Sequence, residues 1–383
     1  MLKLSVWFGV FTSAALVSLA SCADTGTSWM GTNSYYLQGL SDSDQNAYID
    51  AMAKDGAKVV RVWVNGQTAG DCQKGSLIAS SVPPLEAKLG TYNDATLDAL
   101  DKVIVKLSDK GIKALISPHD ANSLLGDYRA DVYFDKWGSA GFYQDQSAFD
   151  TYDARLSYIL NYKGTSSGKV WKEWSEAIMG FDLQRLVFLD YETDSTSGRN
   201  QNEPFAANTS ACTNNDAQNW ACGRATHIRG ELGADNPILV VSGGLGGDYS
   251  HGCTFMPSAM ACAALDAVAV HRYASVPGKW SASAADWVNQ AGGKLVFVEE
   301  WGIDASKYDQ TATFPTEAAD FNSVGLPALY WQFILPSVAQ CPYTAAGDSG
   351  DHFGIVYSSG VDLAGAMQQA RKSKALQDWT AVI

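Results

Sequence analysis

The sequence predicts an α/β fold in which a closed (β/α)8 TIM barrel forms one domain. Short apolar, β-branched runs alternate with amphipathic helical patterns, which is typical of βαβ units and a parallel sheet. Eight such runs occur, and no GxGxxG motif follows the first one, so a barrel is favoured over an open doubly wound sheet. The chain contains no internal repeat, low-complexity tract or proline-rich linker that would divide it.

The eight predicted strands are near-continuous apolar runs, as expected of parallel strands buried on both faces. Val59-Val60 and Val240-Val241 are examples. The predicted strands span 32–37, 58–64, 113–117, 178–183, 238–242, 267–270, 294–298 and 328–333.

The predicted helices carry apolar residues on one face. Asp94 is placed to cap a helix in which Leu97, Leu100 and Ile104 share a face, and which ends near Gly111. Similar patterns predict helices at 42–54, 147–162, 219–232, 282–290 and 363–379.

The first 23 residues resemble a secretory signal peptide. Lys3 precedes an apolar run over 4–19, and the small residues Ser21 and Ala23 suit a cleavage site. This run is shorter than the ~20 residues that a membrane-spanning helix needs. We therefore expect a secreted, extracellular protein whose mature domain covers 24–383, with one glycosylation sequon at 208–210.

Six cysteines remain after residue 23, an even number that predicts disulfides in an exported chain. Pairing by proximity predicts Cys212–Cys222 and Cys253–Cys262, which leaves Cys72–Cys341. No CxxC or HExxH spacing supports a zinc site, and we expect neither a metal nor an organic cofactor.

The formal net charge of −14 disfavours nucleic acid and anionic membranes as partners. A neutral substrate fits better. The chain is also rich in tryptophan and tyrosine, whose flat faces either stack on sugar rings or pack in the core. We expect a monomer.

Polar and aromatic residues follow the apolar runs, at the strand ends where active sites lie in such barrels. Glu203 and Glu300 stand out among them, because cleavage of a glycosidic bond needs one carboxylic acid and one carboxylate. The candidates are Tyr35, Tyr36, Arg61, Trp63, Asn65, His119, Asp120, Asn202, Glu203, His271, Tyr273, Glu299, Glu300, Trp301 and Trp331.

We expect Glu203 to stay protonated and Glu300 to stay ionised. In a retaining enzyme the two carboxyl groups lie roughly 5–5.5 Å apart. Arg61 and the Tyr273 hydroxyl are expected around Glu300. The simpler alternatives are that Arg61 braces the barrel, that His119 is a hydrogen-bonded core group and that Trp331 only packs.

The pattern resembles glycoside hydrolase family 5, whose members include retaining endoglucanases and β-mannanases on (β/α)8 barrels. The matching stretches are Val60-Arg61-Val62-Trp63, Ser117-Pro118-His119-Asp120, Asn202-Glu203-Pro204, Val270-His271-Arg272-Tyr273, Glu300-Trp301-Gly302 and Tyr330-Trp331.

This resemblance implies that Glu203 is the acid/base and that Asn202 contacts the sugar 2-hydroxyl. It implies that Glu300 is the nucleophile, with Glu299 as the neighbour that it could be confused with. Arg61, His119, His271 and Tyr273 would support them, and Trp331 would lie under the sugar being cleaved. Trp63, Trp301 and Trp331 are the tryptophans expected to grip the polysaccharide.

One segment departs from the family pattern. Residues 185–201 separate the fourth predicted strand from Asn202-Glu203, where the family runs directly from strand to motif. We hypothesise that this segment is a translated intron. If it is genuine, it either forms a lid over the mouth or displaces Glu203.

The leading functional hypothesis is an endo-acting hydrolase of β-1,4-mannan. A β-glucanase acting on cellulose or on 1,3- or 1,6-linked glucan, or a β-1,6-galactanase, would use the same core residues. The segments 67–90 and 126–144 are expected to shape the sugar subsites. A hypothesis of another class is a carbohydrate-binding barrel in which the 185–201 segment disables Glu203.

Overall fold

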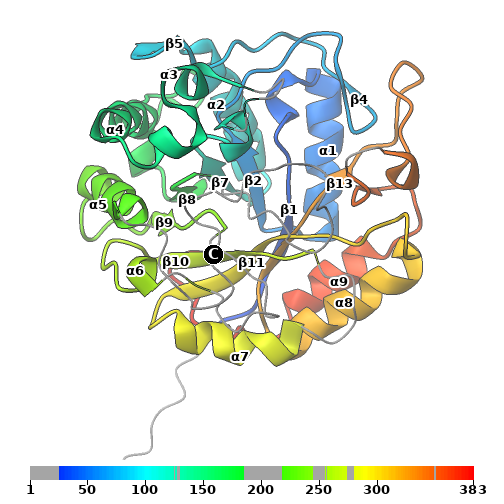
Figure 1. Ribbon diagram of the computed structural model, residues 1–383. Helices are drawn as coiled ribbons and strands as arrows, with labels where there is room; N and C mark the ends of the chain where they lie inside the picture. The colour runs from blue at the N-terminus through cyan, green and yellow to red at the C-terminus, as the bar shows by residue number, and fades with distance from the viewer. Residues whose placement is uncertain are drawn as a thin grey trace, which may run out of the picture.

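Eight parallel strands close into a barrel in the computed structural model (Figure 1). The structure describes residues 26–124, 126, 130–184, 218–244, 255, 257–273, 280–348 and 351–383. Around the barrel the strands follow the order β1-β12-β11-β10-β9-β8-β7-β2. They are β1 (Met30–Asn33), β2 (Val59–Trp63), β7 (Lys113–Ser117), β8 (Ile178–Asp182), β9 (Leu239–Val241), β10 (Ala267–His271), β11 (Leu295–Trp301) and β12 (Ala328–Tyr330).

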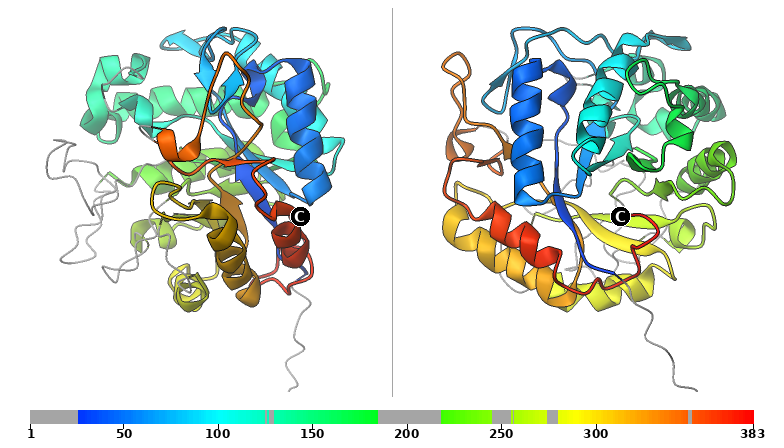
Figure 2. Two further views of the ribbon diagram at one scale, coloured as in Figure 1. Left: turned by 90° about the vertical axis from the view of Figure 1, so that its right-hand side faces the viewer. Right: turned by 180° about the vertical axis from the view of Figure 1, so that it is seen from behind.

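Helices surround the barrel, and α8 packs against α7 and α9 on its outer side (Figure 2). The α-helices are α1 (Asp42–Asp55), α2 (Ala95–Ser108), α3 (Val132–Phe142), α4 (Gln146–Asn161), α5 (Trp220–Leu232), α6 (Pro257–Met260), α7 (Trp280–Gln290), α8 (Gln310–Val324) and α9 (Leu363–Ala370). Short 3-10 helices are η1 (Leu37–Gly39), η2 (Ala121–Leu124), η3 (Trp171–Glu173) and η5 (Ala345–Gly347).

Three small two-stranded sheets lie outside the barrel. β3 (Cys72–Gln73) and β4 (Ser76–Leu77) form one hairpin, and β5 (Glu86–Lys88) and β6 (Thr91–Tyr92) form another. The third pairs β13 (Phe333–Ile334) with β14 (Ile355–Val356) in parallel. Both hairpins fall within 67–90 or directly after it, the segment expected to shape the subsites.

The predicted fold class is confirmed, and all eight predicted strands are present. The first strand is shifted: it spans Met30–Asn33 instead of running to residue 37. The Asn33 side-chain amide donates to the backbone oxygens of Glu299 and Tyr330, and the chain then turns into η1. The turn at η1 therefore replaces the end of the predicted strand.

Several helices differ from the prediction. α3 and α8 were not predicted, because Gly138 interrupts the first at φ 63° and Pro315 lies inside the second. α9 ends at Ala370, well before residue 379, because the chain turns back toward the N-terminal segment, where the Ser28 N–H bonds the Ser373 carbonyl. Asp94 precedes α2 as expected, but its carboxylate accepts from the Tyr158 hydroxyl instead of capping the helix.

The barrel interior is apolar at one end and polar at the other. Val59, Leu115 and Phe297 belong to a buried apolar cluster at the end of the barrel opposite the polar groups. Trp29 and Trp379 also belong to this cluster, with their rings 5.2 Å apart. Because strand side chains alternate between faces, the inward residues above Val59 and Leu115 are Arg61 and Ser117. The polar groups therefore gather at the carboxyl ends of the strands.

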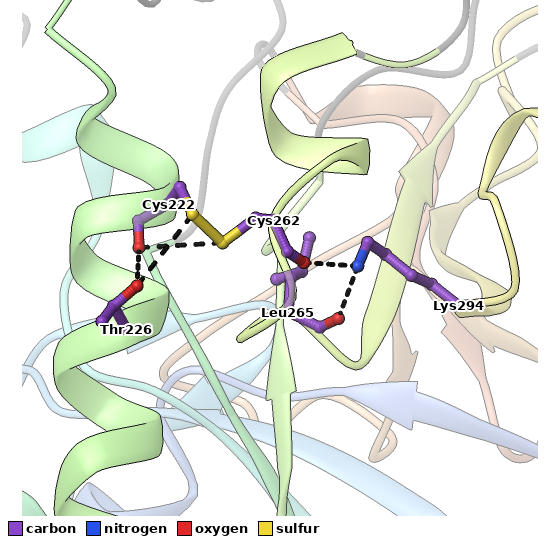
Figure 3. Close-up of a disulfide and its surroundings, with 5 residues drawn as sticks. All are labelled: Cys222, Thr226, Cys262, Leu265 and Lys294. Atoms are coloured by element: carbon purple, nitrogen blue, oxygen red, sulfur yellow. Dashed lines mark hydrogen bonds between the residues drawn. A yellow bond between two sulfur atoms is a disulfide. The ribbon is translucent and has the colours of Figure 1, made fainter.

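Two disulfides are present among the described residues, and one of them corrects a prediction. Cys72–Cys341 is confirmed. The predicted pairings Cys212–Cys222 and Cys253–Cys262 are wrong, because Cys222 bonds to Cys262 (Figure 3). α5 brings Cys222 beside the turn that follows α6, with 5.5 Å between the two Cα atoms, so spatial proximity overrides proximity in sequence. Cys212 and Cys253 lie outside the described residues.

In the part of the chain that the structure describes, no helix combines the length and the apolar character needed to cross a bilayer. The expected signal peptide over 1–23 and the sequon at 208–210 lie outside the described residues.

A buried carboxyl group lies between α7 and α8. Glu317 is 1% exposed and accepts a hydrogen bond from the Trp280 indole N–H. Burial, together with the charge of the nearby Asp320, raises the pKa of Glu317 to about 7. Because the folded state holds this proton to a higher pH than the unfolded state, Glu317 weakens the fold as pH rises from ~4.5 toward 7.

We predict that Glu317→Gln removes this pH dependence. The amide oxygen still accepts from Trp280 and carries no charge to bury. Relative to wild type, the free energy of unfolding should be unchanged near pH 4.5 and higher by about 3 kcal/mol at pH 8. Denaturant melts at both pH values measure this, with exposed Glu173→Gln as the control. A difference that does not change with pH would contradict the prediction.

Candidate active site

A cleft of about 980 Å³ opens at the carboxyl ends of the strands. It lies mainly over β1, β2 and β7 and extends to the loops after β10 and β12. Residues that line it include Tyr35, Trp63, His119, Asp131, Tyr273 and Trp331.

Arg61 lies at the centre of a buried charged cluster beside this cleft. Its Nε is 2.7 Å from Asp182 Oδ2, its Nη1 is 2.7 Å from Glu300 Oε1, and its Nη2 is 3.2 Å from Glu299 Oε2. All four side chains are at most 1% exposed. One guanidinium thus joins carboxyl groups from two other strands, β8 and β11.

Two consecutive glutamates of β11 both reach Arg61, although neighbouring strand residues normally point to opposite faces. The strand is irregular here. Its register against β10 shifts between Val270 and His271, and its register against β12 shifts between Val298 and Trp301. A bulge of this kind re-aims side chains, and it brings Glu299 and Glu300 to the same cation.

Glu300 has the partners that the sequence predicted. Besides the Arg61 pair, the Tyr273 hydroxyl donates to Glu300 Oε2 at 2.7 Å, and His271 Nδ1 lies 3.6 Å from the same oxygen. Glu300 itself is 1% exposed, and the Tyr273 side chain that it contacts lines the cleft. The carboxylate is therefore fixed on both of its oxygens.

Glu299 lies deeper and has a different environment. Its Oε2 is 2.7 Å from His271 Nε2 and 3.2 Å from Arg61 Nη2. Burial raises the pKa of Asp182 well above its usual range; Arg61 opposes this, and the charge of Glu299 adds to it. Burial thus favours the neutral form of Asp182, which lowers the negative charge that faces the single guanidinium.

His119 is held on both ring nitrogens. Nε2 is 2.7 Å from Asp131 Oδ2, and Nδ1 is 2.6 Å from the side-chain amide of Gln184, which also accepts from the Tyr143 hydroxyl. Burial alone would raise the pKa of Asp131, but the adjacent His119 brings it below its usual value. His119 lines the cleft, as predicted for a site residue. It is also only 4% exposed, as expected from the alternative that it is a hydrogen-bonded core group.

Three aromatic rings form one wall of the cleft. Tyr35 and Trp331 stack with ring centroids 6.0 Å apart and an interplanar angle of 18°, and Trp63 meets Trp331 edge-on at 5.8 Å. The Trp331 indole N–H donates to Asp351 Oδ2 at 2.8 Å. All three rings line the cleft, where Trp331 is 7% exposed and Trp63 is 1% exposed.

Trp301 does not belong to this wall, contrary to the predicted contact with the polysaccharide. It is 1% exposed and stacks on Phe314 of α8 at 5.6 Å, with Phe321 4.8 Å away. Because Glu300 points into the barrel, the next side chain along β11 points outward to the helices. Trp301 is therefore a packing residue between barrel and helix.

Asn202 and Glu203 lie outside the described residues, as does the whole of 185–201. Conversely, the structure adds Asn33, Ser117, Asp182 and Gln184, which were not predicted as site residues. Ser117 donates to Asp182. A polar residue that interrupts an apolar strand on its inward face is the signal that could have found Ser117 and Asp182.

In the described ranges, no group of three or more histidine, cysteine or carboxylate side chains is arranged to hold a metal ion.

Comparison with known proteins supports the fold. No family model matches the sequence, and no curated protein matches it either. Solved structures do match. An endo-1,4-β-D-mannanase from Thermotoga petrophila is 20% identical, with a TM-score of 0.63, over 90% of this chain and 99% of that one. An endo-1,4-β-mannanase from Rhizomucor miehei is 18% identical, with a TM-score of 0.62, over 90% and 94%.

A glycoside hydrolase family 5 mannosidase from Rhizomucor miehei is also similar, at 17% identity and a TM-score of 0.59, over 92% of this chain and 97% of that one. At these identities the likeness establishes a shared (β/α)8 fold along nearly the whole chain.

The buried cluster generates a stability prediction. Arg61→Met should lower the free energy of unfolding by about 3–5 kcal/mol at pH 7, because it leaves buried carboxylates without their cation. Asp182→Asn should cost less than about 1 kcal/mol, because an amide reproduces the hydrogen bonds of a protonated carboxyl group. Denaturant unfolding compares the two, with exposed Arg371→Met as the control. If Asp182→Asn were as damaging as Arg61→Met, Asp182 would have to be ionised.

Proposed function

We propose that this protein is a retaining β-glycoside hydrolase of the family 5 type. The observation that carries the proposal is the Glu300 carboxylate, held by Arg61 and the Tyr273 hydroxyl at the carboxyl end of the barrel, next to an aromatic-walled cleft. A nucleophilic carboxylate must be ionised and fixed in direction, and a guanidinium together with a phenol hydroxyl meets both needs.

In the proposed first step, Glu300 attacks the anomeric carbon while an acid protonates the departing glycosidic oxygen. A glycosyl ester forms and the aglycone leaves. In the second step the same acid/base takes a proton from water, which attacks the anomeric carbon and releases Glu300. Two inversions restore the original configuration.

Glu203 is the proposed acid/base and Asn202 the proposed partner of the sugar 2-hydroxyl. Both assignments rest on the Asn202-Glu203-Pro204 motif and its resemblance to family 5. Retention requires that the Glu203 and Glu300 carboxyl groups approach to roughly 5–5.5 Å in the working enzyme.

Glu300 is a better candidate for the nucleophile than its neighbour. Glu299 lies 2.7 Å from His271 Nε2, whereas Glu300 contacts Tyr273, which lines the cleft. Because Glu300 is almost fully buried, a sugar entering the cleft must displace what covers its carboxylate before it can react.

The remaining site residues have supporting roles in this proposal. Arg61 and Tyr273 orient Glu300, and His271 lies between the two glutamates and contacts both. His119 braces the cleft wall with Asp131. Trp331 is the proposed ring on which a sugar stacks, since apolar sugar faces pack on aromatic rings. Trp63, which also lines the cleft, is 1% exposed and supports Trp331 edge-on.

We propose a neutral β-linked polysaccharide as substrate, with β-1,4-mannan first and endo-cleavage. The fold shared with endo-mannanases supports mannan. The cleft charge supports a neutral chain, because acidic residues outnumber basic ones in the lining and would repel uronic acids. The charged lining residues are Asp71, Glu86, Asp120, Asp131, Asp135, Asp348 and Asp351 against Lys74 and Arg155. Disulfides and the signal-like N-terminus support secretion.

Wild-type protein should release reducing ends from β-1,4-mannan faster than from cellulose, 1,3- or 1,6-glucan or 1,6-galactan. Glu300→Ala should lower kcat by about 10⁴-fold or more. Because the change leaves Arg61 and the Tyr273 hydroxyl without a buried partner, circular dichroism is used to verify that the variant is folded at the assay temperature. Added azide should restore turnover of an aryl β-mannoside in this variant. Azide fits the space left by the carboxylate, forms the new bond to the anomeric carbon and expels the phenol, which gives an α-glycosyl azide.

Glu173→Ala, at an exposed position, serves as the control and should keep wild-type activity and gain nothing from azide. Binding of mannan without release of reducing ends by wild type would favour the carbohydrate-binding alternative. Undiminished activity of Glu300→Ala would remove Glu300 from the role of nucleophile.

A further inference from the structure

The β3–β4 hairpin is joined to a loop more than 260 residues away in the sequence. The Cys72–Cys341 disulfide links them over a separation of 269 residues, and the Val338 N–H donates to the Gly75 carbonyl at 2.9 Å. Gly75 has φ 83°, and a side chain there would meet Ser337 Cβ at 2.9 Å. The hairpin tip therefore packs closely against the loop that follows β13.

Lys74, at this tip, forms a partly buried ion-pair cluster. Its Nζ is 2.7 Å from Asp348 Oδ2 and 3.0 Å from Asp351 Oδ2, and it lies 5.6 Å from the centre of the Tyr343 ring. The Lys74 side chain is only 10% exposed. Its backbone has φ 47°, a left-handed conformation that is uncommon for lysine and marks a position held by its surroundings.

The cluster continues to the aromatic wall of the cleft. Asp351 Oδ2, the oxygen that Lys74 contacts, also accepts the Trp331 indole N–H at 2.8 Å. The neighbouring hairpin residue Gln73 accepts from the Tyr35 hydroxyl at 2.9 Å. Since Tyr35 and Trp331 stack on each other, the hairpin holds both members of the ring pair through two adjacent side chains.

We infer that Lys74 is a positioning residue for glycan binding: through Asp351 it fixes the plane of Trp331, against which a sugar ring stacks. This inference rests on the proposed function, because it assumes that the cleft binds a β-glycan. Without the ammonium, Asp348 and Asp351 repel each other, and Asp351 no longer holds a single position below the indole. An arginine at position 74 retains the charge and can pair with the same carboxylates.

The test compares Lys74→Met, Lys74→Arg and Lys102→Met. Lys102 pairs with Asp42 on the outer helices and serves as the matched control. For Lys74→Met we expect KM for mannan to rise about fivefold, since a weakened stacking platform loses about 1 kcal/mol. Kd for mannohexaose should rise by the same factor when it is measured by calorimetry in the Glu300→Ala background, where the ligand is not cut. kcat should change less than about twofold, because the stacking contact stabilises the bound substrate and the transition state equally. Lys74→Arg should recover most of the affinity, and Lys102→Met should match wild type.

A double-mutant cycle separates positioning from general loosening of the fold. Trp331→Phe removes the N–H that Asp351 accepts, so adding Lys74→Met to Trp331→Phe should raise Kd by less than about twofold. An equal fivefold effect with and without Trp331 would overturn the inference, as would an unchanged Kd for Lys74→Met.

The experiments distinguish failure of the hydrolase proposal from failure of the proposed role of Lys74. Wild-type protein that binds mannohexaose and shows the expected coupling, yet releases no reducing ends from any glycan, defeats the hydrolase and leaves the role of Lys74 intact. Normal hydrolysis, together with an effect of Lys74→Met that is the same with and without Trp331, defeats only the role of Lys74. Wild-type protein that neither cuts nor binds any of the neutral glycans overturns both.

Discussion

The contact on which the site depends is the guanidinium of Arg61 with the carboxyl groups of three residues. Each of its nitrogens faces a different partner, so a single side chain from β2 fixes groups supplied by β8 and β11. An ammonium also has three donors, but they lie on one atom, whereas the planar guanidinium spreads its donors over three nitrogens in fixed directions. The same contacts link β2 to β8 and β11, as the bracing alternative expects, and place Arg61 on Glu300, as the proposed supporting role requires.

Burial raises the pKa of Asp182, which favours its neutral form and lowers the charge that one cation must compensate. Three ionised carboxylates in the barrel interior would face one guanidinium, and the uncompensated charge would be costly to bury. The two glutamates have different further partners. Glu299 contacts His271 Nε2 at 2.7 Å, whereas Glu300 receives the Tyr273 hydroxyl on the cleft side. Two adjacent residues of the same type thus differ in environment, and the irregular register of β11 makes this possible.

Much of the architecture could be predicted because apolar periodicity reports burial directly, so the eight strands and most helices were found. The partners of Glu300 were also predictable, because strand ends converge in a barrel. Other features depend on contacts between distant segments. The Cys222–Cys262 bond requires knowing that α5 lies beside the turn after α6, and the outward direction of Trp301 follows from local register. The link from Lys74 to Trp331 runs through Asp351 and has no signal in sequence.

Trapping the glycosyl intermediate tests the central claim most directly. An activated 2-deoxy-2-fluoro-β-mannoside slows the second step, so a retaining enzyme accumulates the ester on its nucleophile, and fragmentation of the labelled peptide by mass spectrometry identifies the carboxylate. The account predicts a single sugar on Glu300. A label on Glu299 or Glu203, or an enzyme that turns over mannan while remaining unlabelled and releasing the inverted anomer, would contradict it.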